Sequence, residues 1–246
     1  ELHGEIHDEE RIIGDGLFEE NGVTIHRLPV LLEYKESNKL LLKGLKSKLR
    51  ELKPDIVHAH GEIEPITLQT IMYSKKLGFK VFIDSHSNSD NCRLNSSLRW
   101  SYYRLVKTFY EFFGERVQCW LPVTYASKDL LIKYFDVSEE HMEILPLGVS
   151  TNRFFKSEEL REAYRIKLGY NENEFVIVSS GKFHPSKEID ILIKAFSIVV
   201  KDYPKIRLLL VGKGSSEYMN HLSSIIESND LSEQIRILDF VDNSKL

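Results

Sequence analysis

The chain contains 246 residues, and its 33 basic and 37 acidic side chains give a formal net charge of −4. That balance argues against a nucleic-acid-binding domain, which would carry a strongly basic surface. A hydrophobic fraction of 42% and a charged fraction of 28% exclude a disordered chain, and two cysteines are too few for a disulfide scaffold or a zinc cluster.

No apolar run approaches the roughly 18 residues that a membrane-spanning helix needs. The low cysteine content fits a reducing compartment. We therefore expect a cytoplasmic protein with no nucleic-acid partner, and the length is sufficient for two domains.

Strands and helices alternate along the first 150 residues, as in a parallel sheet with helices on both faces. Residues 1–20 are acidic and contain several glycines, so we expect little order there beyond a short helix near Leu17. Apolar and β-branched clusters predict strands at 23–30, 55–60, 80–86, 117–123 and 143–147. Helical periodicity predicts helices at 38–52, 65–77, 98–113 and 127–135. Ser127 is the expected N-cap of the last helix.

A βαβ unit is predicted over residues 175–214. The unbroken apolar run 175–178 indicates a strand buried on both faces, and apolar positions recur at helical spacing from Ile189 to Val200. A second buried strand follows at 206–211. Further elements are expected as helices at 160–168 and 216–228 and a strand at 234–241.

The turn after the first strand of this unit has the features of a phosphate site. Such a turn lies at the carboxyl ends of the strands, where open α/β sheets bind ligands, and the following helix N-terminus favours an anion. Lys182 and Lys187 add two cations there. The alternative is a pair of solvated lysines beside an ordinary turn, and the spacing alone leaves both interpretations open.

This stretch resembles the donor-binding core of the retaining family 4 glycosyltransferases, which have two Rossmann-like domains in the GT-B architecture. Gly181, Lys182, Lys187 and residues 192–196 match the Gly-Arg or Gly-Lys turn of the family, its second lysine and its "LI.AF" helix. The resemblance implies that the two lysines hold the diphosphate of a nucleotide sugar and stabilise it as it leaves. Lys182 stands where Arg is commoner, and Glu188 stands where Gly is usual, which places a carboxylate near the phosphates.

Two other segments match the donor side of the family. Gly212 and Gly214 form a G-x-G that is weak alone, and they could let the chain approach the nucleotide. Phe240 and Val241 match the "GFV" loop that abuts the nucleobase in the family, although a packed strand end explains them equally well. The implied donor is a UDP- or GDP-sugar, with no separate cofactor and no metal.

Residues 146–154 resemble the "P.GVD...F" linker between the two domains of this family. The resemblance implies an acceptor-side domain at 1–148 and a donor-binding domain at 149–246, with ligands bound between them. It also places a Glu-x7-Glu motif beyond Leu246 and a glycine-rich loop before the first residue. We therefore expect a fragment whose two domains are both incomplete, and whose activity is uncertain.

Histidines mark the ends of two predicted strands. His58 and His60 flank Ala59, so the strand period of two sends both to one face. His-x-His can supply two metal ligands, but no Asp or His follows closely, and we expect one to line the ligand site and the other to be packed and hydrogen-bonded. His86 matches the family's Thr-x-His region, which implies a place beside the reacting sugar and the acceptor hydroxyl. The alternative is a loop histidine that caps a turn.

Residues 93–120 combine five basic and two acidic side chains with many aromatic ones. A basic, aromatic helix can lie on an anionic membrane, although many such helices belong to the core. Membrane contact at the cytoplasmic face would fit a lipid-linked acceptor.

The resemblance implies transfer of a sugar from a nucleotide diphosphate sugar to a hydroxyl of a glycan or lipid, with retention at the anomeric carbon. His86, Lys182 and Lys187 are the expected catalytic residues, and His60 and His86 the acceptor-side residues. A nucleotide-sugar 2-epimerase shares the architecture, but it needs carboxylates poised for proton abstraction that we cannot assign. The other alternative is a relic that binds nucleotide sugars without catalysis.

Overall fold

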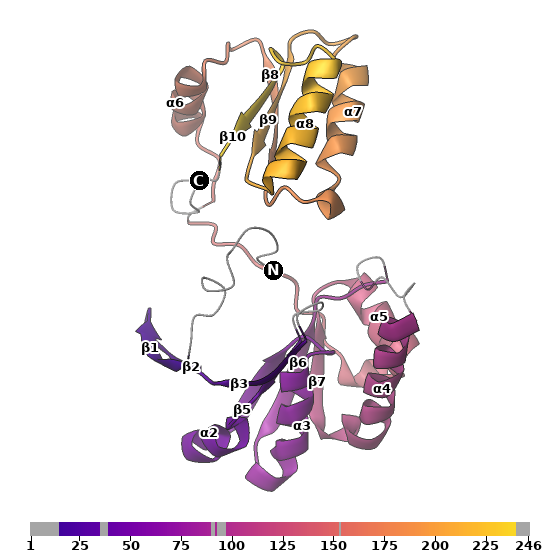
Figure 1. Cartoon of the computed structure of the whole chain (residues 1–246). Coiled ribbons are helices and arrows are strands. Elements are labelled where there is room, and N and C mark those ends of the chain that lie inside the picture. The colour runs from indigo at the N-terminus through magenta and orange to yellow at the C-terminus, as the bar shows by residue number, and fades with distance from the viewer. Residues whose placement is uncertain (1–14, 35–38, 90–91, 93–96, 153, 240–246) are drawn as a thin grey trace. The chain divides into compact units, whose positions relative to one another are not determined.

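Figure 1 presents the computed structural model, which describes residues 15–34, 39–89, 92, 97–152 and 154–239. The described residues form two compact units that divide after Thr151. Each unit contains a parallel three-stranded sheet flanked by helices. The predicted α/β class with parallel sheets is therefore confirmed.

The N-terminal unit has a sheet in the order β5-β6-β7. Its strands are β5 Ile56–His60, β6 Lys80–Ser85 and β7 Val117–Pro122. Its helices are α2 Leu45–Leu52, α3 Pro65–Leu77, α4 Ser97–Phe113 and α5 Tyr125–Phe135. Sheet and helices share one hydrophobic core, in which Ile71, Val81, Ile83, Val106 and Leu131 have no exposed surface.

Local sequence explains the ends of several helices in this unit. Helix α3 has Pro65 at its first turn, where a missing N–H is harmless, and ends at Gly78 with a left-handed φ of 84°. Helix α5 begins earlier than predicted, and its N-cap is Thr124 instead of Ser127. The Thr124 hydroxyl accepts the Ser127 N–H at 3.1 Å, so Ser127 lies inside the first turn.

The first hairpin corrects the prediction of a helix near Leu17. Strands β1 Gly16–Glu20 and β2 Val23–Arg27 pair antiparallel. Asn21 and Gly22 join them, with φ of 52° and 78°. Two consecutive residues with positive φ form the tight hairpin turn that Asn-Gly favours, and this local signal outweighs the weak helical pattern.

A second hairpin corrects the predicted helix at 38–52. The predicted strand at 23–30 forms over 23–27 as β2 and stops there, because a new strand begins at Val30. Strand β3 Val30–Tyr34 pairs antiparallel with β4 Lys39–Leu42, so helix α2 begins only after Gly44. The leucines at 40–42 therefore pair with β3 as part of β4, and a helix over the same residues would lose that strand pairing.

The predicted strand at 143–147 does not form. The Glu143 N–H donates to Trp120 O at 2.9 Å, and the Leu145 N–H donates to Pro122 O at 3.0 Å. The segment thus runs beside β7, but its pairing is limited to an isolated bridge at Met142. Pro146 has no N–H to continue a ladder.

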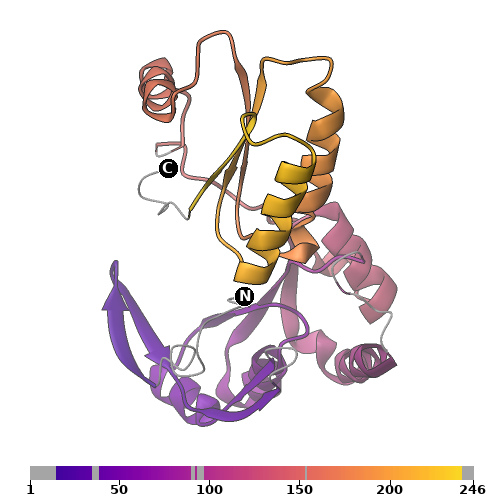
Figure 2. The same ribbon diagram turned by 45° about the horizontal axis from the view of Figure 1, so that its top comes forward.

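The C-terminal unit contains the predicted βαβ unit in a sheet of order β10-β9-β8. Its strands are β8 Phe175–Ser180, β9 Ile206–Val211 and β10 Ile235–Leu238. Its helices are α6 Glu158–Leu168, α7 Ile189–Val199 and α8 Ser216–Ser228. Helices α7 and α8 lie side by side on one face of the sheet (Figure 1), and Ile193, Phe196 and Leu222 pack there with Leu208 and Leu210. The same side-by-side arrangement of α7 and α8 is visible in the rotated view of Figure 2.

The strand at 175–178 is not buried on both faces, contrary to prediction. Phe175 is 70% exposed and Val178 is 58% exposed. β8 lies at the edge of the sheet formed by the described residues, whereas β9 lies between two neighbours and is buried. An unbroken apolar run cannot by itself distinguish an edge strand from a central one.

Candidate functional site

The predicted donor residues lie on two turns that run side by side. The Gly181 N–H donates to Val211 O at 3.0 Å, and the Phe183 N–H donates to Lys213 O at 2.9 Å. These bonds join the chain after β8 to the chain after β9, at the carboxyl ends of both strands. The structure thereby brings Gly181 and Lys182 beside Gly212 and Gly214.

Gly212 and Gly214 are required by this close approach. A Cβ atom at Gly212 would lie 1.9 Å from Gly181 O, and one at Gly214 would lie 2.2 Å from Phe183 O. Both distances are far below van der Waals contact. The neighbouring turn therefore requires glycine at both positions, whether or not a nucleotide also lies against them.

An open hollow of about 540 Å³ lies against the second turn. It is lined by Gly212, Lys213, Gly214, Ser216, Met219, Asn220, Ile237 and Asp239. This position at the carboxyl ends of β9 and β10 is where open α/β sheets bind ligands, and the volume is in the range of small-molecule sites. Lys213 is a cation that the sequence analysis overlooked, and its position between two glycines was the available signal.

Lys182 and Lys187 both lie in the connection from β8 to α7. Lys182 is half-buried and Lys187 is exposed. A short 3₁₀ helix, Pro185–Lys187, precedes α7. Helix α7 begins after Glu188, whose side chain makes no capping hydrogen bond to the described residues. Lys187 thus lies just before the first turn of α7, which also contains the carboxylate of Asp190, and the contact of the two lysines with a diphosphate remains a prediction.

Glu188 has a φ of 53°, in the left-handed region. Glycine adopts this conformation without steric cost, which explains why glycine suits the position. Phe240 and Val241, the other residues assigned to the donor site, lie outside the described residues.

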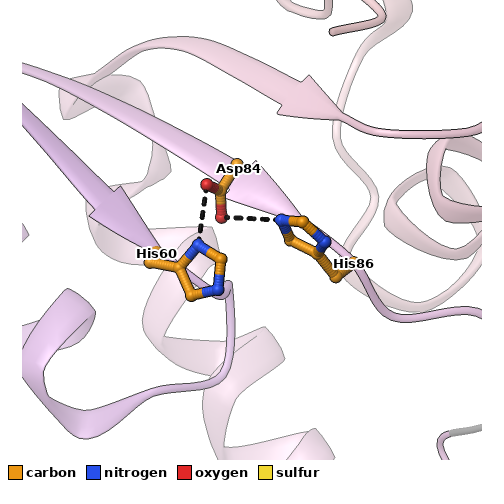
Figure 3. A group of neighbouring side chains, drawn as sticks. All are labelled: His60, Asp84 and His86. Atoms are coloured by element: carbon orange, nitrogen blue, oxygen red, sulfur yellow. Dashed lines mark hydrogen bonds and ion pairs between the residues drawn. The ribbon is translucent and has the colours of Figure 1, made fainter. Parts of the chain in front are cut away.

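Three histidines lie around Asp84, at the carboxyl end of β6, and Figure 3 shows two of them, His60 and His86. Asp84 Oδ2 lies 2.8 Å from His60 Nδ1 and 3.1 Å from His58 Nε2. Asp84 Oδ1 accepts the Gly61 N–H at 3.0 Å and lies 3.8 Å from His86 Nε2. His60 is paired with Asp84 in the register of β5 and β6, so the sheet itself aligns the two side chains.

The Asp84 carboxylate is the anchor of this cluster. Its burial would raise the pKa of the carboxyl, but the hydrogen bonds from His60 and the Gly61 N–H, with the charges of His60 and His58, hold that pKa below its usual value. Asp84 is therefore ionised at neutral pH. An ionised carboxylate at His60 Nδ1 favours the proton on that nitrogen, which leaves Nε2 with a lone pair.

Comparison with known families assigns both parts of the chain. Residues 5–153 match Glycosyltransferase Family 4, and residues 161–246 match Glycosyl transferases group 1. The chain belongs to glycosyltransferase family 4. The resemblance seen in the sequence is therefore confirmed.

Curated relatives of this family 4 chain include enzymes of glycolipid synthesis. The chain is 26% identical to alpha-monoglucosyldiacylglycerol synthase of Acholeplasma laidlawii over 240 residues, which cover 92% of this chain and 59% of the relative. It is 33% identical over 119 residues to a GDP-mannose-dependent phosphatidylinositol monomannoside mannosyltransferase of Corynebacterium glutamicum, covering 47% of this chain and 30% of the relative. The chain thus spans less than two thirds of the length of these relatives.

The solved structure of HepE from Anabaena in complex with UDP and glucose is similar in fold. The TM-score is 0.64 at 19% identity, and the match covers 81% of this chain and 52% of that chain. The predicted GT-B architecture is confirmed by this likeness.

Asp84 is the residue of this family 4 chain that sequence reasoning missed. The acid sought near His58 and His60 lies 24 residues after His60 in sequence, on the next strand. The endings "VHAH" and "IDSH" of two consecutive parallel strands were the available signal, since such ends meet at one sheet edge. The expectation that one histidine of the pair is packed is wrong, because 47% of the His58 side chain and 75% of the His60 side chain are exposed.

Proposed function

We propose that the full-length protein transfers a sugar from a nucleotide diphosphate sugar to an acceptor hydroxyl, with retention of anomeric configuration. The observation that carries this proposal is the pair of joined glycine turns at the carboxyl ends of β8 and β9. Lys182, Lys187 and Lys213 are the cations on these turns. The donor domain is 149–246 and the acceptor domain is 1–148 in this proposal.

In the proposed reaction the bond from the anomeric carbon to the diphosphate oxygen breaks, and a bond to the acceptor oxygen forms. The acceptor hydroxyl loses its proton, and the nucleoside diphosphate leaves with an added negative charge. Lys182, Lys187 and the α7 N-terminus stabilise that charge as it develops. The UDP complex of HepE and the GDP-mannose dependence of the mannosyltransferase support a UDP- or GDP-sugar as donor.

His86 and His60 act on the acceptor side of the proposed reaction. His86 is half-exposed and lies 3.8 Å from the buried Asp84 carboxylate. Asp84 orients the imidazoles, while His86 orients the acceptor hydroxyl or receives its proton.

Helix α4 supports a lipid-linked acceptor and contact with the cytoplasmic face of a membrane. Its inner face, including Tyr103 and Val106, is buried in the core. Leu98, Leu105 and Phe112 recur every seven residues on the outer face and are 63%, 67% and 70% exposed. The helix therefore has a core face and an apolar outer face, which also carries basic residues.

Arg104 lies on the outer side of α4 with its guanidinium 4.7 Å from the Trp100 ring centre. Arginine and tryptophan together suit the headgroup region of an anionic membrane. The name of the Acholeplasma relative, a synthase of a glucosyl diacylglycerol, supports the same kind of acceptor. Within the described residues, no helix combines the length and apolar character needed to cross a bilayer.

Calorimetry of the full-length protein with UDP and GDP tests the donor proposal. We expect one of the two nucleotides to bind, and we expect Lys187→Ala to weaken that binding about tenfold because one cation is lost from the diphosphate. Lys201→Ala removes an exposed lysine from the far end of the α7 region and serves as the control. Absence of heat with either nucleotide would reject the transferase proposal, whereas nucleotide binding without sugar transfer to any lipid or glycan acceptor would favour the non-catalytic relic.

A further inference from the structure

Three side chains of different elements offer their ligand atoms to one point at the edge of the N-terminal sheet. The ligand atoms of His60, Asp84 and His86 all lie within 4.8 Å of one another. Figure 3 shows the two imidazoles on either side of the Asp84 carboxylate, each with a ring nitrogen toward it. We propose that His60, Asp84 and His86 bind a transition-metal ion of the zinc class.

The ligand atoms of the three side chains lie close enough together for a single ion to bridge them. Two ligand atoms that each lie about 2.0–2.2 Å from a tetrahedral Zn²⁺ are separated by about 3.3–3.5 Å. His60 Nδ1 lies 2.8 Å from Asp84 Oδ2, and His86 Nε2 lies 3.8 Å from Asp84 Oδ1, so the two histidines face different oxygens of the carboxylate. His58 Nε2, at 3.1 Å from the same Asp84 oxygen that His60 contacts, is a fourth candidate ligand. To bind one ion, the three side chains must rotate until their ligand atoms, which lie within 4.8 Å of one another, surround it, and His60 must release the proton that Nδ1 donates to Asp84.

The ligand types select the metal. Imidazole nitrogens with one carboxylate suit Zn²⁺, Co²⁺, Ni²⁺ or Cu²⁺, whereas Mg²⁺ and Ca²⁺ prefer oxygen ligands alone. The site is thus different in kind from a magnesium site that would accompany a diphosphate. It differs in place as well, because it lies on the N-terminal unit, whereas the lysine-bearing turns lie on the C-terminal unit.

The surroundings fit an open site with one fixed ligand. Asp84 is buried, and its Oδ1 accepts the Gly61 N–H, which is the outer hydrogen bond that metal-ligating carboxylates commonly make, so Oδ2 is the oxygen left for the ion. The side chains of His60 and His86 are 75% and 38% exposed, so an ion can enter from solvent and keep water as a further ligand. Ring centres of the two histidines are 4.7 Å apart, which is close enough for both to reach one ion.

Metal binding would withdraw His86 from the acceptor. Zinc is therefore expected to inhibit sugar transfer reversibly, and this consequence rests on the proposed function. Binding of the ion does not rest on it, because none of the ligands belongs to the donor turns. Zinc calorimetry and nucleotide calorimetry can accordingly fail independently of each other.

The test is calorimetry of the full-length, chelator-treated protein with ZnCl₂. We expect one tightly bound ion per chain, at least tenfold weaker binding in Asp84→Asn and in His86→Ala, and no heat with MgCl₂ at the same concentrations. His141→Ala, an exposed histidine elsewhere on the N-terminal unit, should leave zinc affinity unchanged. The visible absorption of bound Co²⁺, lost in the same two variants, provides a second measurement.

The N-terminal sequence requires its own control, because His3 and His7 lie among acidic residues there. A variant with both histidines replaced by alanine should still bind zinc at Asp84. Loss of binding only in that variant would overturn the proposal, as would zinc affinity that Asp84→Asn and His86→Ala leave unchanged. Circular dichroism of each variant checks folding, and the half-exposed His86 gives a substitution that should leave the core intact.

Discussion

Replacement of Gly212 by alanine tests whether the two donor turns must lie in contact. The added Cβ would be 1.9 Å from Gly181 O and 2.9 Å from a ring carbon of Phe183. Since carbon and oxygen make favourable contact near about 3.5 Å, the turns must separate by more than 1 Å. That movement breaks the hydrogen bond from the Gly181 N–H to Val211 O, which is 3.0 Å long.

The cost follows from these contacts. Overpacking of a close-packed site costs about 1–3 kcal/mol, and loss of a backbone hydrogen bond adds about 1 kcal/mol, so we expect Gly212→Ala to destabilise the C-terminal unit by about 2–4 kcal/mol. Amide hydrogen exchange of β8, β9 and β10 in the full-length protein measures this loss locally, without assuming that both units unfold together. Nucleotide affinity should fall in parallel.

Gly148→Ala is the matched control, because no described atom lies within 4 Å of its added Cβ and its φ is not in the left-handed region. It should change stability by less than about 0.5 kcal/mol. If the β9 amides exchange as slowly in Gly212→Ala as in Gly148→Ala, the steric requirement for glycine at position 212 is wrong.

Three further changes test other parts of the molecule. Glu188→Gly should change the free energy of unfolding by no more than about 1 kcal/mol, because relief of the left-handed strain offsets the greater entropy of the unfolded chain. Calorimetry should show about threefold tighter nucleotide binding, because the substitution removes a negative charge near the phosphates. Weaker nucleotide binding would contradict this. Asp84→Asn should lower kcat about tenfold or more with little change in donor KM, because the imidazoles lose their orienting charge; steady-state kinetics that show only a KM effect would refute the orienting role. Leu105→Glu should abolish cosedimentation with anionic phospholipid vesicles, whereas Ile166→Glu, the same kind of change on exposed α6, should not. Equal losses in both variants would remove the special role of α4.

Local sequence determined the elements whose signals lie within a few residues. Pro65 and Gly78 bound α3, and apolar periodicity placed α7, because each of these features acts along one helix. The βαβ unit and the family resemblance followed from the same local patterns. The Asn21–Gly22 turn was an equally local signal that the prediction of a helix near Leu17 overlooked.

The tertiary structure decided what depends on contacts between distant residues. Residues 39–42 form a strand because β3 lies beside them, and β8 is exposed because it is the edge strand of the sheet that the described residues form. The three histidines share Asp84 because the register of β5 against β6 brings position 60 opposite position 84. Gly212 and Gly214 are needed because another turn lies against them. Pairing register and close approach between chain segments are set by the whole packed unit, so no window of sequence contains them.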